Sequence, residues 1–265
     1  MSELQFSPLS LASYYVSLRF NQTELSFATA FFIRRNTKCY LVTNWHVLSG
    51  RNPNNGACLS DTYGVPNNIL VRAHTNNEFI NFLDFEIPLL NSDDTPRWLE
   101  HPKFKEKVDV VALEVCLPPE QYVVHDIEQF IEPFNEGTIE CVADDVFVIG
   151  YPLGLSAGGL FPIWKRASIA SEPIIDIDGL PKLLIDTASR KGMSGSPVML
   201  YRKRPVLITN GKLEESGAQI SRFFMKLVGV YSGRVGVCPG NKNIEAQLGT
   251  VWKSSVINEI IDQKT

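Results

Sequence analysis

The stretch KGMSGSPVML, residues 191–200, decides how this chain is interpreted. Ser194 lies between Gly192 and Gly195, so the backbone around it can turn sharply and let another molecule approach closely. A nucleophilic serine needs such a turn, because its hydroxyl must project while backbone N–H groups point at the oxygen that becomes negative. The N–H groups of Gly192 and Ser194 are the candidates for this oxyanion hole. A plain Gly/Ser/Pro turn between two strands would look the same, so the rest of the chain has to decide.

The composition excludes several classes of protein. The chain has 265 residues, of which 44% are hydrophobic and 20% are charged, as expected for a globular protein with a sizeable core. The net charge is −4 and no block of like charges stands out, so we predict neither a nucleic acid nor a membrane as partner. The short basic cluster at 202–204 is interpreted as a solvated turn. No stretch approaches the ~18 uninterrupted apolar residues of a membrane-spanning helix.

The cysteines indicate neither disulfides nor a metal site. They are odd in number and scattered, with no C-x-x-C pair and no ligand spacing with histidine: Cys39, Cys58, Cys116, Cys141 and Cys238. We expect reduced, mostly buried thiols, no bound metal and no cofactor. The glycines at 150–154 lack the Lys-Ser/Thr of a phosphate-binding loop. No signal peptide is evident at the N-terminus, so the expected compartment is the cytoplasm.

Strand signals recur along the chain, whereas helix periodicity is scarce. Apolar, β-branched or aromatic stretches that predict strands lie at 14–20, 27–33, 39–43, 69–73, 78–83, 108–115, 145–151, 163–170, 182–186, 197–201, 206–209 and 227–234. The proline-containing, acidic stretch 117–140 is expected to connect two halves. The apolar positions within 254–264 follow the i, i+1, i+4, i+5 pattern of an amphipathic C-terminal helix. The pattern predicts an all-β protein with two antiparallel barrels and a cleft between them.

Two further residues stand where a strand meets a loop. His46 directly follows the apolar strand 39–43, which is where a side chain is presented to a cleft, although a lone histidine in apolar surroundings is commonly a core residue. Asp109 opens the apolar strand 108–115. It is either an acid at a strand edge or the carboxylate that accepts a hydrogen bond from a histidine and fixes its tautomer.

Other residues of the same types are weaker candidates. Asp84 and Asp93 are not followed by such a strand. The remaining histidines, His74, His101 and His125, lie in polar stretches that are interpreted as loops, and we assign them no role.

The motifs together resemble those of the chymotrypsin-like serine proteases, above all the bacterial Deg/HtrA-type and glutamyl-endopeptidase-type members. Those proteases carry Leu-Val-Thr-Asn-x-His-Val at the catalytic histidine, and this chain has LVTNWHV at 41–47. They carry Asp-(Ile/Val)-Ala-(Val/Leu)-Leu at the aspartate, and this chain has DVVAL at 109–113. The segment IGYPLG at 149–154 resembles the end of the first strand of their second barrel.

The resemblance covers most of residues 14–262 and implies a chymotrypsin-like double barrel with six strands in each half. It implies one trypsin-like peptidase domain over 1–265, with no PDZ domain. The first barrel would span about 1–125, the second about 140–253 and the helix 254–264.

The activity implied by the resemblance is that of a serine endopeptidase. His46 would act as general base, Asp109 would orient it, and Ser194 would attack, with the N–H groups of Gly192 and Ser194 as the oxyanion hole. Residues expected to bind a protein or peptide substrate are Ala188, Ser189, Lys191, Tyr231, Ser232 and Gly233. In this family the strand at 227–234 pairs with the substrate backbone.

The specificity and the regulation are less determined. By register, Ala188 and Ser189 line the base of the specificity pocket, which favours a small or medium uncharged side chain. The neighbouring Arg190 and Lys191 would instead attract an acidic one, and this alternative stays open. A regulatory protein partner is also considered.

The chain departs from the family pattern at two places. It has TAFF at 29–32 where the family has Thr-Gly-x-x-Phe, and Met193 where the family commonly has Asp or Asn before the serine. Met193 cannot form the ion pair with a freed N-terminus that activates secreted zymogens. We therefore expect a constitutively folded enzyme, or one that is ordered by a substrate or partner.

Two other functions were weighed. A catalytically silent module would keep the fold and use the cleft to hold a peptide. An α/β-hydrolase would need Gly-x-Ser-x-Gly between a strand and a helix, with the histidine last in order. The chain has its candidate histidine first, and Ser196 stands where the second glycine of that motif would be.

Overall fold

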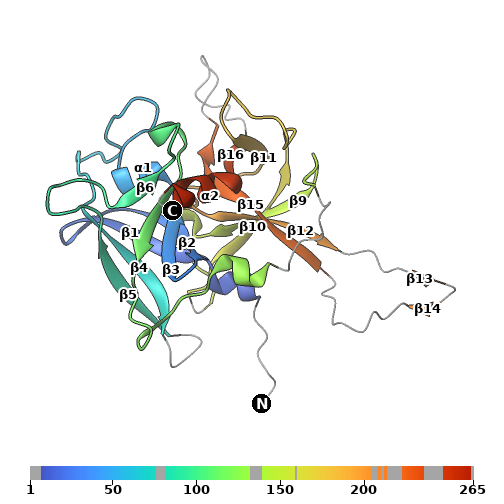
Figure 1. Ribbon diagram of the computed structural model, residues 1–265, viewed down its shortest axis with the longest axis horizontal. Helices are drawn as coiled ribbons and strands as arrows, with labels where there is room; N and C mark the ends of the chain where they lie inside the picture. Colours follow the sequence, from blue (N-terminus) through green and yellow to red (C-terminus); the bar gives the residue numbers. More distant parts are fainter. Residues whose placement is uncertain are drawn as a thin grey trace.

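The computed structural model describes residues 7–75, 81–131, 139–158, 160–203, 208–209, 212–213, 223–235 and 247–263. Its strands fall into two groups that lie side by side, the first half of the chain in blue to green and the second in yellow to red (Figure 1). Every pairing between the strands of either group is antiparallel.

The first half forms a sheet with the strand order β5-β4-β1-β2-β3-β7-β6, and β8 pairs with β4. The strands are β1 (Tyr14–Phe20), β2 (Thr23–Arg35), β3 (Lys38–Thr43), β4 (Asn68–Thr75), β5 (Phe82–Pro88), β6 (Trp98–Glu100), β7 (Val111–Val115) and β8 (Tyr122–Val123). Tight turns join β1 to β2 and β2 to β3, with Asn21 and Asn36 at positive φ, which asparagine tolerates well.

The second half forms a closed barrel with the order β10-β11-β16-β15-β12-β9. Its strands are β9 (Asp145–Gly150), β10 (Ile163–Ile169), β11 (Lys182–Asp186), β12 (Pro197–Lys203), β15 (Phe223–Arg234) and β16 (Leu248–Lys253). A separate two-stranded piece consists of β13 (Ile208–Thr209) and β14 (Lys212–Leu213). Helical turns are few: α1 (Trp45–Ser49), α2 (Ser255–Asp262), and short 3-10 helices at Pro8–Leu11, Lys105–Lys107, Ile127–Phe130 and Pro152–Gly154.

One apolar core joins the two halves. Phe31 and Ile33 of β2 share a buried cluster with Ile149 of β9, Met199 of β12 and Trp252 of β16. Burying each such side chain contributes about 1.5–3 kcal/mol. The cluster therefore holds the halves in one arrangement, which is a condition for a site built from both.

The C-terminal helix α2 was predicted over 254–264 and lies at Ser255–Asp262, so the prediction is confirmed. Its apolar face, Val256, Ile257, Ile260 and Ile261, is buried in the same cluster. The helix contacts β6 and β7 of the first half. The helix therefore packs against both halves of the chain (Figure 1).

The all-β class and a closed six-stranded second barrel are confirmed. In the first half the sheet has eight strands rather than six, and among the described residues no pairing joins its end strands β5 and β6. A closed first barrel therefore stays a prediction. The starts of the strands expected at 78–83 and 206–209 lie outside the described residues.

Two details of the sequence interpretation are wrong. The basic cluster at 202–204 is not a solvated turn at its start, because Arg202 and Lys203 belong to β12 and the Arg202 guanidinium pairs with Asp144. The cysteines are not mostly buried either. The described ones are free and half-buried or exposed (Cys39, Cys58, Cys116 and Cys141), and Cys238 lies outside the described residues.

Candidate active site

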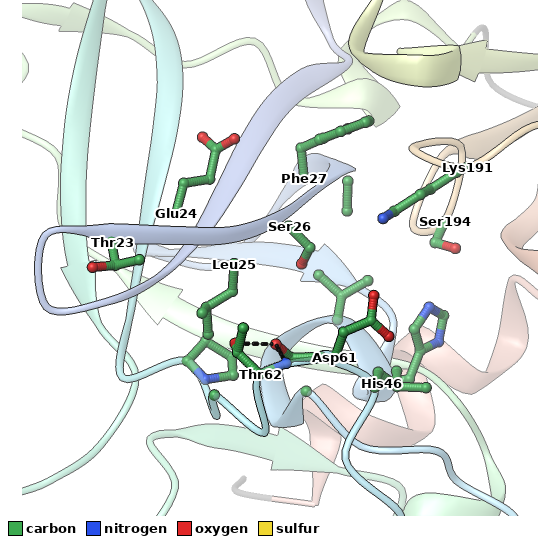
Figure 2. Close-up of a pocket in the computed structure, with 17 residues that line it drawn as sticks. Thr23, Glu24, Leu25, Ser26, Phe27, His46, Asp61, Thr62, Lys191 and Ser194 are labelled. Carbon is green, nitrogen blue, oxygen red and sulfur yellow. Dashed lines mark hydrogen bonds between the residues drawn. The ribbon is translucent and has the colours of Figure 1, made fainter.

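Residues from both halves meet at one pocket of about 510 Å³. His46 of α1 comes from the first half and Ser194, just before β12, from the second, and both line the pocket (Figure 2). The rest of its wall comes mainly from the start of β2, from the α1 region and from the loop around 59–64.

His46 and Asp109 are brought together by the pairing of β3 with β7. The two strands are antiparallel, with Thr43 opposite Val111, so the residues after β3 and before β7 lie at the same edge of the sheet. The His46 Nδ1 lies 2.6 Å from Asp109 Oδ2, and the His46 backbone N–H donates to Asp109 Oδ1 at 2.8 Å. The Asn44 side chain donates to the Asp109 carbonyl at 2.7 Å. The carboxylate thus fixes both the backbone and the ring of the histidine.

The electrostatics of this pair favour a protonated imidazole. Burial alone would lower the pKa of His46, but the charge of Asp109 and its hydrogen bond outweigh it, so the pKa of His46 is raised above its ordinary value of 6.5. Asp109 itself is 3% exposed. A histidine in this setting can accept a proton and hold it while a bond is made or broken nearby.

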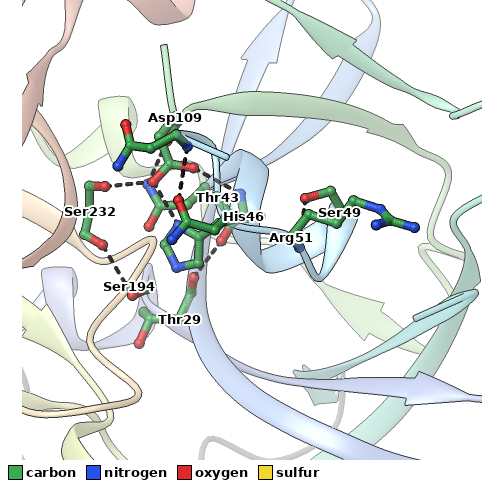
Figure 3. A network of polar contacts seen from close by, with 11 residues as sticks. Thr29, Thr43, His46, Ser49, Arg51, Asp109, Ser194 and Ser232 are labelled. Atoms are coloured by element: carbon green, nitrogen blue, oxygen red, sulfur yellow. Dashed lines mark hydrogen bonds and ion pairs between the residues drawn. The ribbon is translucent and has the colours of Figure 1, made fainter. Parts of the chain in front are cut away.

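Ser232 of β15 links the acid to the candidate nucleophile. Its hydroxyl donates to Asp109 Oδ2 at 2.5 Å, and its carbonyl accepts from the Ser194 hydroxyl at 3.3 Å (Figure 3). Among the described residues, Ser194 Oγ hydrogen-bonds to the Ser232 carbonyl and not to the His46 ring. Such bonds between nucleophile and base are often long or poorly aligned in proteases without substrate and tighten when it binds.

The turn that carries Ser194 requires the glycines on both sides of it, Gly192 and Gly195. Gly192 and Gly195 have φ of +95° and +81°, in the left-handed region that favours glycine. A Cβ on Gly192 would collide with the Tyr151 carbonyl, and a Cβ on Gly195 with the Thr29 carbonyl. Met193, between them, is fully buried in the apolar core of the second barrel. The residue that departs from the family pattern therefore anchors the turn by packing instead of by an ion pair.

Thr29 of β2 holds the same turn from the first half. Its backbone N–H donates to the Ser194 carbonyl at 2.9 Å, and its hydroxyl donates to the Gly192 carbonyl at 2.8 Å. The hydroxyl also accepts from the Tyr151 N–H at 3.2 Å. Thr29 was assigned no role from the sequence. The segment TAFF at 29–32 was the only sequence motif that could have pointed to this residue.

The N–H groups expected to form the oxyanion hole are free to receive a ligand. The Gly192 and Ser194 carbonyls both accept hydrogen bonds from Thr29. These two bonds fix the orientation of the adjoining peptide groups. Among the described residues, neither the Gly192 N–H nor the Ser194 N–H has a hydrogen-bond acceptor.

The residues expected to bind substrate fall into two groups. Ala188 and Lys191 are exposed, and the Lys191 ammonium lies 5.9 Å from the centre of the Phe27 ring. Ser189 and Tyr231 are 2% and 1% exposed, and their hydroxyls hydrogen-bond to each other. Neither side chain therefore faces an open pocket, although Ser189 was expected at the base of one.

The Tyr231 ring is also packed tightly from the side of β16. A Cβ on Gly249 would lie 2.5 Å from Tyr231 Cε2, so only a glycine fits beside the ring. Ser232 hydrogen-bonds to Asp109 and Ser194. Gly233 has φ +143° and lies next to the part of β15 that is expected to pair with substrate.

The other histidines lie outside this site: His74 belongs to β4 instead of a loop, and His101 lies in a loop as expected but is buried. His101 is 1% exposed and its Nε2 lies 2.9 Å from Glu259 of α2. His74 lies on β4, is 5% exposed, and contacts the ring of His125 with 5.2 Å between ring centres. Among the described residues, no helix is long and apolar enough to cross a membrane, and no group of three side chains could hold a metal ion.

Comparison with known proteins supports the fold. No family model matches the sequence, and no curated protein matches it. Among solved structures, the serine endoprotease from Yersinia pestis matches with a TM-score of 0.53 and 16% identity, over 98% of this chain and 67% of that chain. The Rv3671c protease from M. tuberculosis gives a TM-score of 0.47 in its active form, with 18% identity over 96% of this chain and 80% of that one.

At these identities the likeness concerns the fold alone. The chain shares its fold with the Yersinia serine endoprotease, and its candidate site lies where the two halves of the chain meet.

Proposed function

We propose that this protein is a serine endopeptidase that hydrolyses peptide bonds in protein or peptide substrates. The observation that carries the proposal is the chain of contacts from His46 to Asp109 to Ser232 to Ser194, assembled at the junction of the two halves. The histidine is oriented by a buried carboxylate, and the serine lies on a glycine turn with free N–H groups, which is the arrangement that acyl transfer requires.

The proposed reaction has two stages. When substrate binds, the Ser194 hydroxyl leaves the Ser232 carbonyl and turns to His46, which takes its proton as the oxygen attacks the scissile carbonyl. The Gly192 and Ser194 N–H groups donate to the oxyanion of the tetrahedral intermediate. His46 then protonates the leaving amine, and an acyl-enzyme remains on Ser194. Water activated by His46 hydrolyses this ester and restores the enzyme.

The substrate on the acyl side of the scissile bond is proposed to carry a small, uncharged side chain. Ser189 and Tyr231 occupy the space beneath Ser194's turn and satisfy each other's hydroxyls, so a large side chain there would have to displace a buried pair. The alternative, an acidic side chain attracted by Arg190 and Lys191, rests on exposed cations that solvent screens.

The remaining expectations are kept as parts of the proposal. The chain is proposed to be related to the bacterial Deg/HtrA-type and glutamyl-endopeptidase-type proteases and to form a single peptidase domain with a double barrel. We also propose a cytoplasmic location and control by a protein partner. We expect no nucleic acid or membrane as partner.

The test is labelling by a fluorophosphonate together with hydrolysis of a casein-type substrate. Ser194→Ala is expected to abolish labelling and to lower hydrolysis by about 10⁴- to 10⁶-fold. Ser196→Ala is a matched control, because among the described residues the buried Ser196 hydroxyl has no hydrogen-bond partner to lose. Labelling of the Ser194→Ala variant to the extent of the wild type would reject the assignment.

A peptide-binding module without catalysis is the second candidate. It is favoured by the hydrogen bond of Ser194 to the Ser232 carbonyl, which leaves the hydroxyl unbonded to its base. Binding of peptides at unchanged length, with no fluorophosphonate labelling, would identify this function.

A further inference from the structure

No residue of β15 lines the pocket beside His46 and Ser194. Of the residues expected to bind substrate, only Lys191 lines it, and Ser189, Tyr231, Ser232 and Gly233 do not. Because β15 is where the acyl half of a substrate is expected to pair, a pocket without β15 is assigned to the other half. That half leaves as the amine that His46 protonates, and His46 is part of the pocket wall.

The wall of this pocket is built and held in place. Leu25 and Ser26 extend from β2 toward the side of the pocket that carries Asp61 and Thr62 (Figure 2). A Cβ on Gly64 would lie 2.7 Å from Leu25 Cδ2, so the loop is packed directly on the strand. At its start, the Leu59 N–H donates to the Gly50 carbonyl at 2.8 Å. The loop thus stands against both β2 and the end of α1.

The lining favours an apolar occupant. Leu25, Phe27, Val47 and Leu59 supply apolar surface, and Leu59 is 50% exposed. The charged side chains that line the pocket, Glu24, Asp61 and Lys191, are all exposed. A volume of about 510 Å³ is within the range of ligand sites and exceeds what one small side chain fills.

We propose that the protein selects its cleavage site by a bulky apolar side chain, such as Leu, Met or Phe, directly after the scissile bond. This inference rests on the proposed endopeptidase function and adds its substrate class. On the acyl side, Ser189 and Tyr231 are buried against each other, whereas the leaving side offers a preformed pocket. Binding energy that acts on the leaving half can be used in the acylation step, where that half is still attached.

The first experiment uses the wild-type protein and pairs of peptides that differ in one residue. The acyl part is constant, and the residue after the scissile bond is Phe, Leu, Ala or Glu. Burying a large apolar side chain predicts that kcat/KM for Phe or Leu exceeds that for Ala by about 10- to 100-fold. Equal values for Phe and Ala, with Ser194 still labelled by a fluorophosphonate, would overturn the inference and leave the proposed function standing.

A variant tests whether the pocket is responsible. Ser26→Phe fills the pocket from β2 and is expected to reduce the Phe-to-Ala ratio by roughly tenfold. Ser92→Phe, an exposed serine outside the pocket, is the matched control and should keep the wild-type ratio. Rates are divided by the fraction of protein that the fluorophosphonate labels, so a misfolded fraction does not count. A ratio that is the same in Ser26→Phe and the wild type would contradict the inference.

A third measurement needs no variant and holds even where Ser26→Phe fails to fold. An ester substrate forms the acyl-enzyme, and water competes with an added amine for it. The amine nitrogen attacks the acyl carbonyl, the Ser194 oxygen leaves with a proton from His46, and an amide forms. Phenylalanine amide is expected to capture the acyl group about tenfold more efficiently than alanine amide. Equal capture would overturn the inference, and absence of any acyl-enzyme would overturn the proposed function and this inference together.

Discussion

The Thr29 hydroxyl donates to the Gly192 carbonyl at 2.8 Å, although the two residues are 163 positions apart. With the bond from the Thr29 N–H to the Ser194 carbonyl, it ties the nucleophile turn of the second half to β2 of the first. The distance between the candidate nucleophile and its base is therefore set by a direct contact between the halves. Thr29 touches no reacting atom in this arrangement and is a positioning residue.

Removing the Thr29 hydroxyl should slow acylation more than it weakens substrate binding. Thr29→Val keeps the shape but leaves the Gly192 carbonyl and the Tyr151 N–H without their partner, at a cost of about 1–3 kcal/mol. We expect kcat to fall by roughly 10- to 100-fold with little change in KM, measured on a peptide substrate. Thr29→Ser should restore most of the rate.

The control for this prediction is Thr187→Val. Thr187 is 3% exposed, and among the described residues its hydroxyl has no hydrogen-bond partner. The variant should therefore stay close to wild type in kcat. An equal loss of kcat in both variants would show that replacing any buried threonine lowers the rate and that Thr29 has no specific positioning role.

The pH dependence of activity should report the contact between His46 and Asp109. The raised pKa of His46 means that the neutral, base-competent ring forms only above its ordinary value of 6.5, so kcat/KM should rise with pH through a midpoint above 6.5. In Asp109→Asn the carboxylate charge is gone and burial, which lowers the pKa of His46, remains. We expect the midpoint to fall and kcat to drop by about 10⁴-fold, the loss known for this change in a serine protease triad. A midpoint that does not move would mean that Asp109 does not act on His46.

Local sequence patterns predicted most of the strands because alternation and turn residues are local properties, but β6, β8 and β16 were missed. The turns after β1 and β2 fall between the predicted strands, and the apolar face of α2 lies where the pattern predicted it. The short helix α1 was missed, since five residues carry too little periodicity.

The candidate site was only partly accessible from sequence, because its contacts are non-local. Short motifs gave His46, Asp109 and Ser194, but nothing near Thr29 in the sequence shows that it meets Gly192. In the same way, the Ser189–Tyr231 pair joins residues 42 positions apart, and the sequence register alone suggested an open pocket there. The leaving-side pocket needs four separate segments and could not be predicted from any one of them.

Acid should destabilise the fold through His74. Burial, with a smaller contribution from the nearby His125, lowers the pKa of His74 to about 4, so the folded protein holds it neutral while the unfolded chain takes up a proton near 6.5. The stability this gives is present above pH 6.5 and is lost as the pH falls toward 4, at up to about 1.4 kcal/mol per pH unit. Unfolding by urea at several pH values should show this slope, and His74→Phe should flatten it. An unchanged slope in the variant would assign the acid sensitivity to other groups.

The C-terminal helix offers a comparison between apolar packing and an ion pair on one element. Ile260 is fully buried in the cluster that joins the two halves, so Ile260→Ala should lower the free energy of unfolding by about 2–5 kcal/mol. Glu259, one position away, pairs with His101, but its side chain is 49% exposed, so Glu259→Gln should cost less than about 1 kcal/mol. Denaturant unfolding of both variants measures the difference. A larger loss for Glu259→Gln would mean that the helix is held by its polar contact and that the shared apolar core contributes little at this end of the chain.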